Sequence, residues 1–280
     1  MKQSGESKAL ERYIEDSQYV YGNWSEAHIG DFDTKILDRG DGTILFQVPI
    51  AKYLEPFWVP LLRHFEETRR VITYERRESA TMPLNAWDRA GDLCLILDHL
   101  GIDRCDFVSH SSGAIAALHF ALMYPERVDS LVLMNVAAYY PELRGVTKNL
   151  GNTIAQLLPD FVLLPLFLTY IAERGTEAFD IHRHAFSRFR PLSKYMKYSL
   201  NQIVMTHDIR EQLCHIRHPV LLINRADDRV VSMDAMEYMK RRLPNCAGLE
   251  SVIGGGHMFH YARAEQIIGF MEAFYASQTG

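Results

Sequence analysis

The sequence has few cysteines, and they are scattered. Four of the 280 residues are cysteines, namely Cys94, Cys105, Cys214 and Cys246. No two of them form a Cys-x-x-Cys pair, and no pair of histidines has zinc-like spacing with a third ligand nearby. This pattern argues against a disulfide framework and against a zinc site. We therefore expect reduced, mostly buried thiols and no metal.

Long runs of basic residues and an apolar N-terminal segment are also missing. The chain has 30 basic and 35 acidic residues, a net charge of −5, which argues against a nucleic-acid partner. The first residues, MKQSGESKALERYIEDS, contain no apolar signal core, so we expect a cytoplasmic protein. The apolar stretch 154–172 contains Asp160 and two prolines, which favours a broken pair of buried helices over a stable membrane span.

What the sequence does contain is a regular alternation of short apolar runs and amphipathic stretches. Runs such as 43–48, 131–136 and 220–224 predict strands, and residues 85–100 and 112–124 predict helices between strands. Strands that are apolar throughout indicate a parallel sheet covered on both faces. The glycines of the GDG sequence that follows Arg39 predict a hairpin-type turn.

Residues 141–217 interrupt the alternation, being helical in pattern, apolar in their first half and basic and aromatic in their second. We expect them to form a helical cap over the carboxyl edge of the sheet, where ligands bind in open α/β sheets. The predicted organisation is an N-terminal extension (1–22), a core (23–140 and 218–280) and this cap. On the cap, His182 and His184 are expected on a solvated basic face, with binding of an acidic substrate group as the alternative.

A cluster of polar residues lies between a predicted strand and a predicted helix, in the sequence FVSHSSGA at 107–114. The sharp reversal strains the central residue, Ser111, and requires small residues two positions away, at Ser109 and Gly113. It also directs the N–H of Ser112 toward any group attached to Ser111. A strand–helix turn with an ordinary serine cap would use similar residues.

Possible partners for a serine nucleophile follow two other predicted strands. Asp227 and Asp228 come after the strand at 220–224, and His257 follows the strand at 248–253. The carboxyl ends of parallel strands share one edge of the sheet, so these groups are expected near Ser111. A serine needs such a base, and the base needs an orienting acid.

From about residue 40 to 276 the chain resembles the α/β-hydrolase family. CDFVSHSSGAIAALHFALMYPERVDSLVLMN resembles the nucleophile-elbow strand, helix and next strand, HPVLLINRADDRVV the acid-bearing turn, and GGGHMFHYARAEQIIGFMEAF the histidine loop and last helix. The resemblance implies a Ser111 nucleophile, a His257 base and an Asp228 acid, with Asp227 as the alternative acid. It also implies no cofactor.

The expected oxyanion hole departs from the family pattern. Its first donor is the N–H of Ser112. Counting back from Trp58 puts Pro49 and Ile50 in the place of the family's His-Gly and makes Ala51 the second donor. Counting from the strand end would instead put Gln47 and Val48 in the place of His-Gly. The family's D-x-R-G-x-G-x-S loop is replaced by ERRESATM at 75–82. A missing donor costs about 3 kcal/mol of transition-state stabilisation.

The sequence thus predicts an α/β fold with a mostly parallel, doubly wound sheet and an inserted helical cap. The expected function is a serine hydrolase that cleaves a small apolar ester, thioester or carbon–carbon-bonded ketone through an acyl-enzyme. Two alternatives stay open: a lyase, cyclase or cofactor-free oxygenase that uses His257 and Asp228 as a base, and a non-catalytic ligand-binding member of the fold. The expected partner is a small-molecule substrate, and a homodimer is left open.

Overall fold

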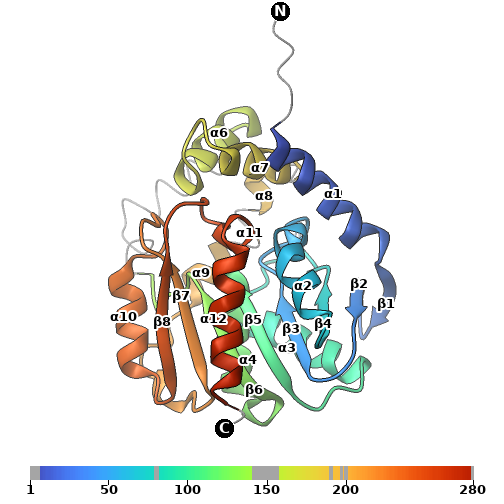
Figure 1. The fold of residues 1–280 in the computed structure, drawn as a ribbon, viewed down its shortest axis with the longest axis vertical. Coiled ribbons are helices and arrows are strands. Elements are labelled where there is room, and N and C mark those ends of the chain that lie inside the picture. The colour runs from blue at the N-terminus through green and yellow to red at the C-terminus, as the bar shows by residue number, and fades with distance from the viewer. Residues whose placement is uncertain are drawn as a thin grey trace, which may run out of the picture.

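The computed structural model describes residues 7–78, 82–140, 158–188, 192–195, 198 and 201–278. Its centre is an eight-stranded sheet with the order β1-β2-β4-β3-β5-β6-β7-β8 (Figure 1). The strands are β1 (Ser25–Ile29), β2 (Phe32–Arg39), β3 (Ile44–Val48), β4 (Arg70–Tyr74), β5 (Cys105–His110), β6 (Val128–Met134), β7 (Val220–Arg225) and β8 (Cys246–Val252). The six strands from β3 to β8 run parallel, and β1 and β2 are antiparallel. This confirms the predicted fold class.

Helices surround the sheet. They are α1 (Lys8–Gly22), α2 (Val59–Phe65), α3 (Ala86–His99), α4 (Ser112–Met123), α6 (Asp160–Ile171), α7 (Glu177–Phe186), α8 (Leu192–Tyr195), α9 (Asn201–Thr206), α10 (Met233–Arg242), α11 (Phe259–Ala262) and α12 (Ala264–Ala276). Short 3-10 turns are η1 (Glu55–Trp58), η2 (Pro125–Arg127) and η5 (Leu213–His215). The start of α3 is fixed by Asn85, whose side chain accepts hydrogen bonds from the first turn while Asp88 completes a capping box.

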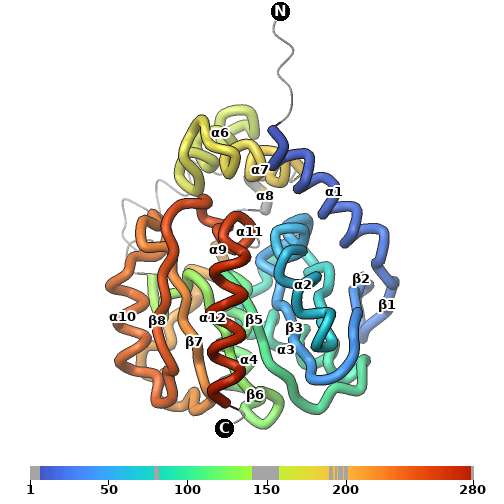
Figure 2. The backbone as a smooth tube through the Cα atoms, viewed as in Figure 1, coloured from blue at the N-terminus to red at the C-terminus, as the bar shows by residue number. Residues whose placement is uncertain are grey.

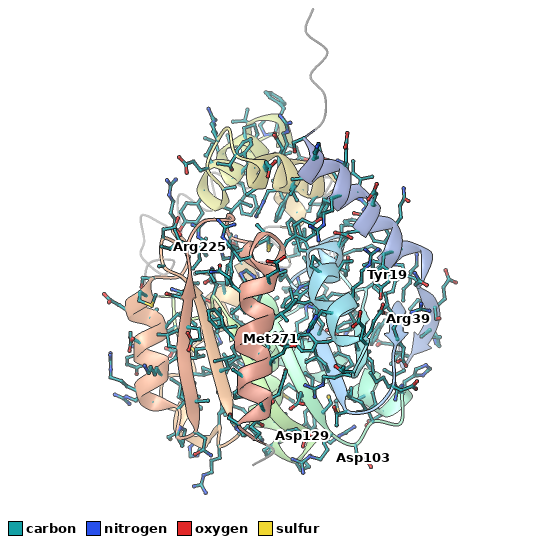
Figure 3. All side chains as sticks on the ribbon, viewed as in Figure 1. Tyr19, Arg39, Asp103, Asp129, Arg225 and Met271 are labelled. Carbon is teal, nitrogen blue, oxygen red and sulfur yellow. The ribbon has the colours of Figure 1, made fainter. Side chains whose placement is uncertain are left out.

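The central strands are apolar throughout because both of their faces are covered. In β5, Phe107 joins the apolar cluster with α3, α4 and α10, whereas the next residue, Val108, joins the cluster with α2 and α12. In β6, Leu133 belongs to the first of these clusters and Val132 to the second. Met271 of α12 is fully buried in the second cluster (Figure 3). Alternate residues of each strand therefore form two separate apolar cores.

The predicted hairpin turn at GDG is wrong, because β4 lies between β2 and β3 in the sheet. Gly40 and Gly42 do adopt positive φ values, of 74° and 98°. A Cβ atom added at Gly40 would lie 2.2 Å from the carbonyl oxygen of Arg69. The glycines thus allow the chain to pass closely by the segment that enters β4 rather than to reverse beside its own strand.

Above the carboxyl edge of the sheet, α6 and α7 form a layer with the N-terminal helix α1, as the tube in Figure 2 shows. Residues of α1, η1, α6, α7 and α8 share a third apolar cluster that includes Tyr13, Phe57, Leu163 and Ile181. The α9 helix joins the core instead, with Ile203 packed in the cluster of α3 and α4. Residues 141–157 of the predicted cap lie outside the described residues, and its boundaries stay a prediction.

The apolar stretch 154–172 differs in part from expectation. Residues 154–157 lie outside the described part, and α6 continues through Pro165, so the expected break is not there. Leu163 is buried, but Phe161 is 79% and Leu166 56% exposed, so only one side of α6 is packed. Among the described residues, no helix combines the length and apolar character needed to span a membrane.

Candidate active site

The strand β5 passes directly into α4 at Ser111, which has φ 52° and ψ −124°. A positive φ is strained for a serine. It is maintained here because β5, before Ser111, is paired within the sheet and α4 begins directly after it. The Ser111 N–H donates to the carbonyl oxygen of Met134, and its own carbonyl oxygen accepts from Ile115. A Cβ added at Gly113 would lie 2.5 Å from the carbonyl oxygen of Val48. The predicted sharp turn and its requirement for a small residue at position 113 are confirmed.

Three side chains far apart in the sequence meet at this turn. His257 Nε2 lies 3.1 Å from Ser111 Oγ, and His257 Nδ1 lies 3.0 Å from Asp228 Oδ2. Both ring nitrogens are therefore within hydrogen-bond distance of a partner. The His257 side chain is 7% exposed and that of Asp228 only 1%. These three side chains have the arrangement that a nucleophile, its base and an orienting acid require.

The surroundings of Asp228 favour its ionised form. Burial alone would raise its pKa, but His257 and the backbone N–H groups of Val231 and Val230 outweigh burial, and the pKa is lowered. The two backbone groups donate to Asp228 Oδ1 at 2.9 and 2.7 Å. An ionised carboxylate only accepts, so Nδ1 of His257 carries the proton. The lone pair of Nε2 then faces the hydroxyl of Ser111.

Asp227, the alternative acid, lies elsewhere. Its side chain is 54% exposed, accepts from the N–H of Gly254 at 3.2 Å and pairs with Arg225 at 3.4 Å. Arg225 lies at the cap end of the sheet, away from Asp103 and Asp129 at the opposite end (Figure 3). The structure therefore brings Asp228, and not its neighbour, to His257.

The loop at 49–53 lies against the turn at Ser111. Ser112, the first residue of α4, donates its hydroxyl to the carbonyl oxygen of Ile50 at 2.8 Å. The Ile50–Ala51 peptide is therefore beside the turn, and Ala51 is fully buried. Positions 47 and 48 lie inside β3, where they are paired with Val108 and Ser109. Of the two counts made from the sequence, the one that selects Ala51 is compatible with this geometry.

Comparison with known proteins identifies the family of the chain. The sequence model described as "Alpha/beta hydrolase family" matches residues 52–269. The chain belongs to the alpha/beta hydrolase family. Membership confirms the resemblance inferred from the sequence and makes the chain a hydrolase.

Individual relatives and structures support the same assignment. A Caulobacter protein named "Putative carbamate hydrolase RutD" is 31% identical over 261 residues, which cover 86% of this chain and 90% of the relative. A hydrolase from Pseudomonas aeruginosa has the same fold, with a TM-score of 0.76 and 21% identity over 91% of this chain and 98% of its own. An enol-lactonase from Burkholderia xenovorans has a TM-score of 0.75 and 19% identity, covering 90% of this chain and all of its own.

The described part of the altered hydrolase-family loop, residues 75–78, stabilises the site in a way that the sequence did not predict. Arg76, which is 1% exposed, contacts Ser112 Oγ at 3.4 Å and pairs with Glu78 at 2.8 Å. Glu78 also pairs with Arg89 and accepts from the N–H of Lys52 at 3.4 Å. This charged cluster therefore connects the 49–53 loop to the start of α4. The only sequence signal was the mixed charge of Glu75-Arg76-Arg77-Glu78.

Several buried histidines lie beside the site and in the core. His110 and His260 are fully buried, and their rings lie 4.8 Å apart, with His110 4.7 Å from the ring of His257. Burial lowers the pKa of both far below the usual range, so they are neutral. His182, expected on a solvated face, is only 1% exposed, whereas His184 one position beyond Arg183 is exposed as expected. His119 is buried against His207 at 3.0 Å.

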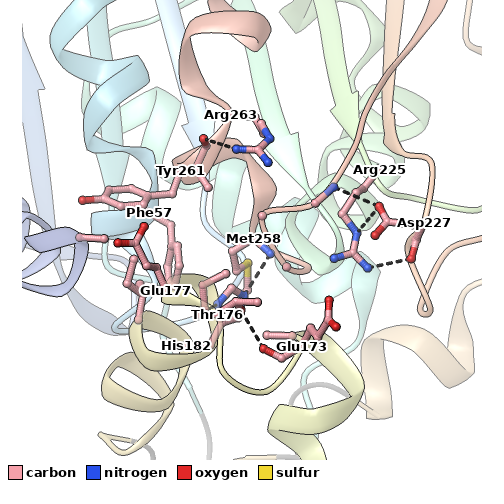
Figure 4. Close-up of a pocket in the computed structure, with 18 of the residues that line it drawn as sticks. Phe57, Glu173, Thr176, Glu177, His182, Arg225, Asp227, Met258, Tyr261 and Arg263 are labelled. Atoms are coloured by element: carbon pink, nitrogen blue, oxygen red, sulfur yellow. Dashed lines mark hydrogen bonds and ion pairs between the residues drawn. The ribbon is translucent and has the colours of Figure 1, made fainter. Parts of the chain in front are cut away.

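A cavity of about 770 Å³ is lined by residues of α1, α7 and α11 and by Gly254, Gly255 and Gly256, and Figure 4 shows many of its lining residues. Charged residues of both signs line it, including Arg225, Arg263, Glu173 and Glu177. Ser111 is not among the described residues that line it, so this cavity lies apart from the serine hydroxyl. Within the described residues, no group of three or more His, Cys, Asp or Glu side chains is arranged to hold a metal.

Proposed function

We propose that this hydrolase cleaves a small, largely apolar ester or carbamate through a covalent acyl-enzyme. Ser111 is the nucleophile, His257 the general base and Asp228 the orienting acid. The observation that carries the proposal is the continuous chain of contacts from Asp228 Oδ2 through both nitrogens of His257 to Ser111 Oγ, at 3.0 and 3.1 Å. A strained backbone at the serine supports it, because strain of this kind is found where a side chain must be presented for reaction.

In the first half of the reaction, Ser111 Oγ forms a bond to the substrate's carbonyl carbon while His257 Nε2 takes the hydroxyl proton. Asp228 stabilises the imidazolium that results. When the intermediate collapses, the bond to the leaving alcohol or amine breaks and His257 returns the proton to it. Water, deprotonated by His257, then attacks the acyl group and releases the acid product with Ser111 restored.

The negative oxygen of the intermediate needs backbone donors. We assign this task to the N–H of Ser112, at the start of α4, and to the N–H of Ala51. The hydrogen bond between Ser112 Oγ and the Ile50 carbonyl supports this, since it fixes the Ile50–Ala51 peptide against the turn. One such donor contributes about 3 kcal/mol to transition-state stabilisation.

The substrate class is inferred from two sources. The relatives named as carbamate hydrolases favour an acyl group attached to nitrogen or oxygen. The apolar cluster that α6 and α7 share with Ile50, Ala51 and Met258, next to the serine and histidine, favours a substrate with little charge. Thioesters and carbon–carbon-bonded ketones, which the sequence also allowed, would react with the same three residues.

The test is active-site labelling with a serine-reactive fluorophosphonate, followed by turnover of p-nitrophenyl esters and aryl carbamates. We expect wild-type protein to be labelled and Ser111→Ala to be unlabelled, with turnover lower by roughly a factor of 10³ to 10⁶. Ser109→Ala, two residues earlier and buried beneath the turn, is the matched control and should still be labelled. A Ser111→Ala protein that kept its turnover while His257→Ala lost it would instead indicate a His–Asp base acting without a serine nucleophile.

A further inference from the structure

His182 lies on α7, in the cap layer, with its ring against the loop that carries His257 (Figure 4). The residue is 1% exposed. Its ring also lies 5.2 Å from that of Phe57. A fully buried imidazole in this position must have its polar atoms satisfied by the protein.

Both ring nitrogens of His182 have a partner, and the partners define the tautomer. Nδ1 lies 2.6 Å from the carbonyl oxygen of Ala178, which can only accept, so Nδ1 donates. The N–H of Met258 donates to Nε2 at 3.2 Å, so Nε2 carries the lone pair. Burial lowers the pKa of His182 to about 4, which keeps the ring neutral and able to accept at neutral pH.

Met258 is the residue directly after His257, and the cap also holds His257 itself. The N–H of His257 donates to the carbonyl oxygen of Ile171, at the end of α6, at 2.6 Å. A Cβ added at Gly256 would lie 2.9 Å from His182 Cε1, so the ring is also in close contact with the residue before His257. Three consecutive loop residues are therefore held by two cap helices.

Before His257, the loop is also held by Asp227, which accepts from the N–H of Gly254 at 3.2 Å. Gly254, Gly255 and Gly256 adopt φ values of 73°, 86° and 72°, a backbone that glycine enters and leaves at low cost. All three glycines also line the 770 Å³ cavity, and Gly255 lies close to Phe259 and Ala262. The hydrogen bonds from α6 and α7 are thus the direct restraints on the backbone of His257.

We propose that His182 is a positioning residue, which fixes the His257 loop through the hydrogen bond that it accepts from Met258 and so holds the imidazole in line with Ser111. The inference rests on the proposed function. Reactive groups displaced by about 1 Å lose roughly a hundredfold in rate, so a loop restraint of this kind affects turnover without touching the substrate. It also makes the cap part of the catalytic apparatus.

The experiment compares His182→Leu with His182→Gln. Leucine keeps most of the volume but cannot accept a hydrogen bond, whereas the Gln amide oxygen can accept from Met258 and its NH2 can donate to Ala178. We expect His182→Leu to lower kcat by tenfold to a hundredfold with KM changed less than about twofold. His182→Gln should retain kcat within about threefold. In His182→Leu the amide proton of Met258 should exchange faster with solvent, and in His182→Gln it should not.

Equal losses of kcat in the Leu and Gln variants would show that packing, and not the acceptor, matters, and would overturn the proposal. So would a His182→Leu protein with rapid Met258 exchange and full kcat. If the Leu variant fails to fold, His182→Phe serves instead, because its ring keeps the shape of the side chain, cannot accept from Met258, and should raise Met258 exchange and lower kcat together. Failure of the proposed function is distinguishable, since Ser111→Ala would then keep its turnover while Met258 exchange would still report the restraint.

Discussion

At the scale of single residues, the site depends on small differences between chemically identical neighbours. Asp227 and Asp228 are adjacent carboxylates, yet one is half exposed and the other is buried against His257. The difference arises because the turn after β7 directs the Asp228 carboxylate back onto the N–H groups of Val230 and Val231. Sequence reasoning could rank these two aspartates only by family pattern, whereas the backbone geometry separates them.

This difference predicts unequal effects of the same substitution. Asp228→Asn should lower kcat by roughly a factor of 10⁴, because an amide in this place favours the wrong tautomer of His257. Asp227→Asn, one position earlier, should leave kcat within about threefold. Steady-state hydrolysis of the best ester substrate measures both. A larger loss in the Asp227 variant would mean that the acid has been assigned to the wrong residue.

Glu55 offers a prediction for stability. Its side chain is 1% exposed, and burial raises its pKa to about 8. The unfolded chain releases this proton near pH 4.3 and the folded chain near pH 8, so this group makes the protein less stable as pH rises across that window. Glu55→Gln should therefore gain stability relative to wild type between pH 5 and 8, by on the order of 1 to 4 kcal/mol. Urea unfolding at both pH values measures it, with exposed Glu26→Gln as the control that should show no such gain.

At the scale of elements, the turn from β5 to α4 is constrained by a strand that is distant in sequence. Gly113 faces the backbone of Val48 and Pro49, so the start of α4 and the 49–53 loop share one tightly packed contact. The need for a small residue was predictable from the turn itself. The identity of the contacting segment was not, because it follows from the pairing of β3 with β5.

Glycine-to-alanine substitutions at two helix positions should therefore have opposite effects. Gly113→Ala should lower the free energy of unfolding by about 1 to 3 kcal/mol, since its methyl group would overlap a backbone oxygen. It should also lower kcat, because the loop that carries Ala51 must move. Gly91→Ala in α3 meets no atom within 4 Å and should be neutral or stabilising by up to about 1 kcal/mol. Denaturant unfolding of the two variants measures both changes in the free energy of unfolding.

At the scale of the whole molecule, buried neutral histidines make the fold sensitive to acid. Burial lowers the pKa of His119 to about 3 and that of His182 to about 4, and it also lowers the pKa of His110 and His260. In the unfolded chain these groups take up protons near pH 6.5. Their contribution to stability is thus complete above pH 6.5 and is lost progressively as the pH falls toward their folded pKa values.

His119→Gln tests this dependence away from the active site. Between pH 6.5 and 4.5 the variant should lose less stability than wild type, by about 2 kcal/mol, because one buried proton acceptor has been removed. The substitution also removes the contact with His207, which changes stability at every pH. The test therefore compares only how steeply the free energy of unfolding changes with pH in the two proteins. His28, whose side chain is 72% exposed, is the control, and His28→Gln should leave the slope unchanged. Parallel slopes for all three proteins would contradict the prediction.

The sequence by itself determined the parts of this protein that depend on local pattern. Continuous apolar runs identified the central strands, and the FVSHSSGA segment identified the turn at Ser111, because periodicity and turn chemistry are properties of neighbouring residues. It missed the β1–β2 hairpin, and it placed His182 on the solvated side of its helix.

Only the tertiary structure decided which groups meet. Whether Asp227 or Asp228 reaches His257, whether Glu78 restrains Lys52, and whether α7 supports the His257 loop all depend on contacts between segments far apart in the chain. Such contacts follow from how the helices and loops pack on the sheet edge. No local pattern encodes that packing, because it is set jointly by all the surfaces that are buried together.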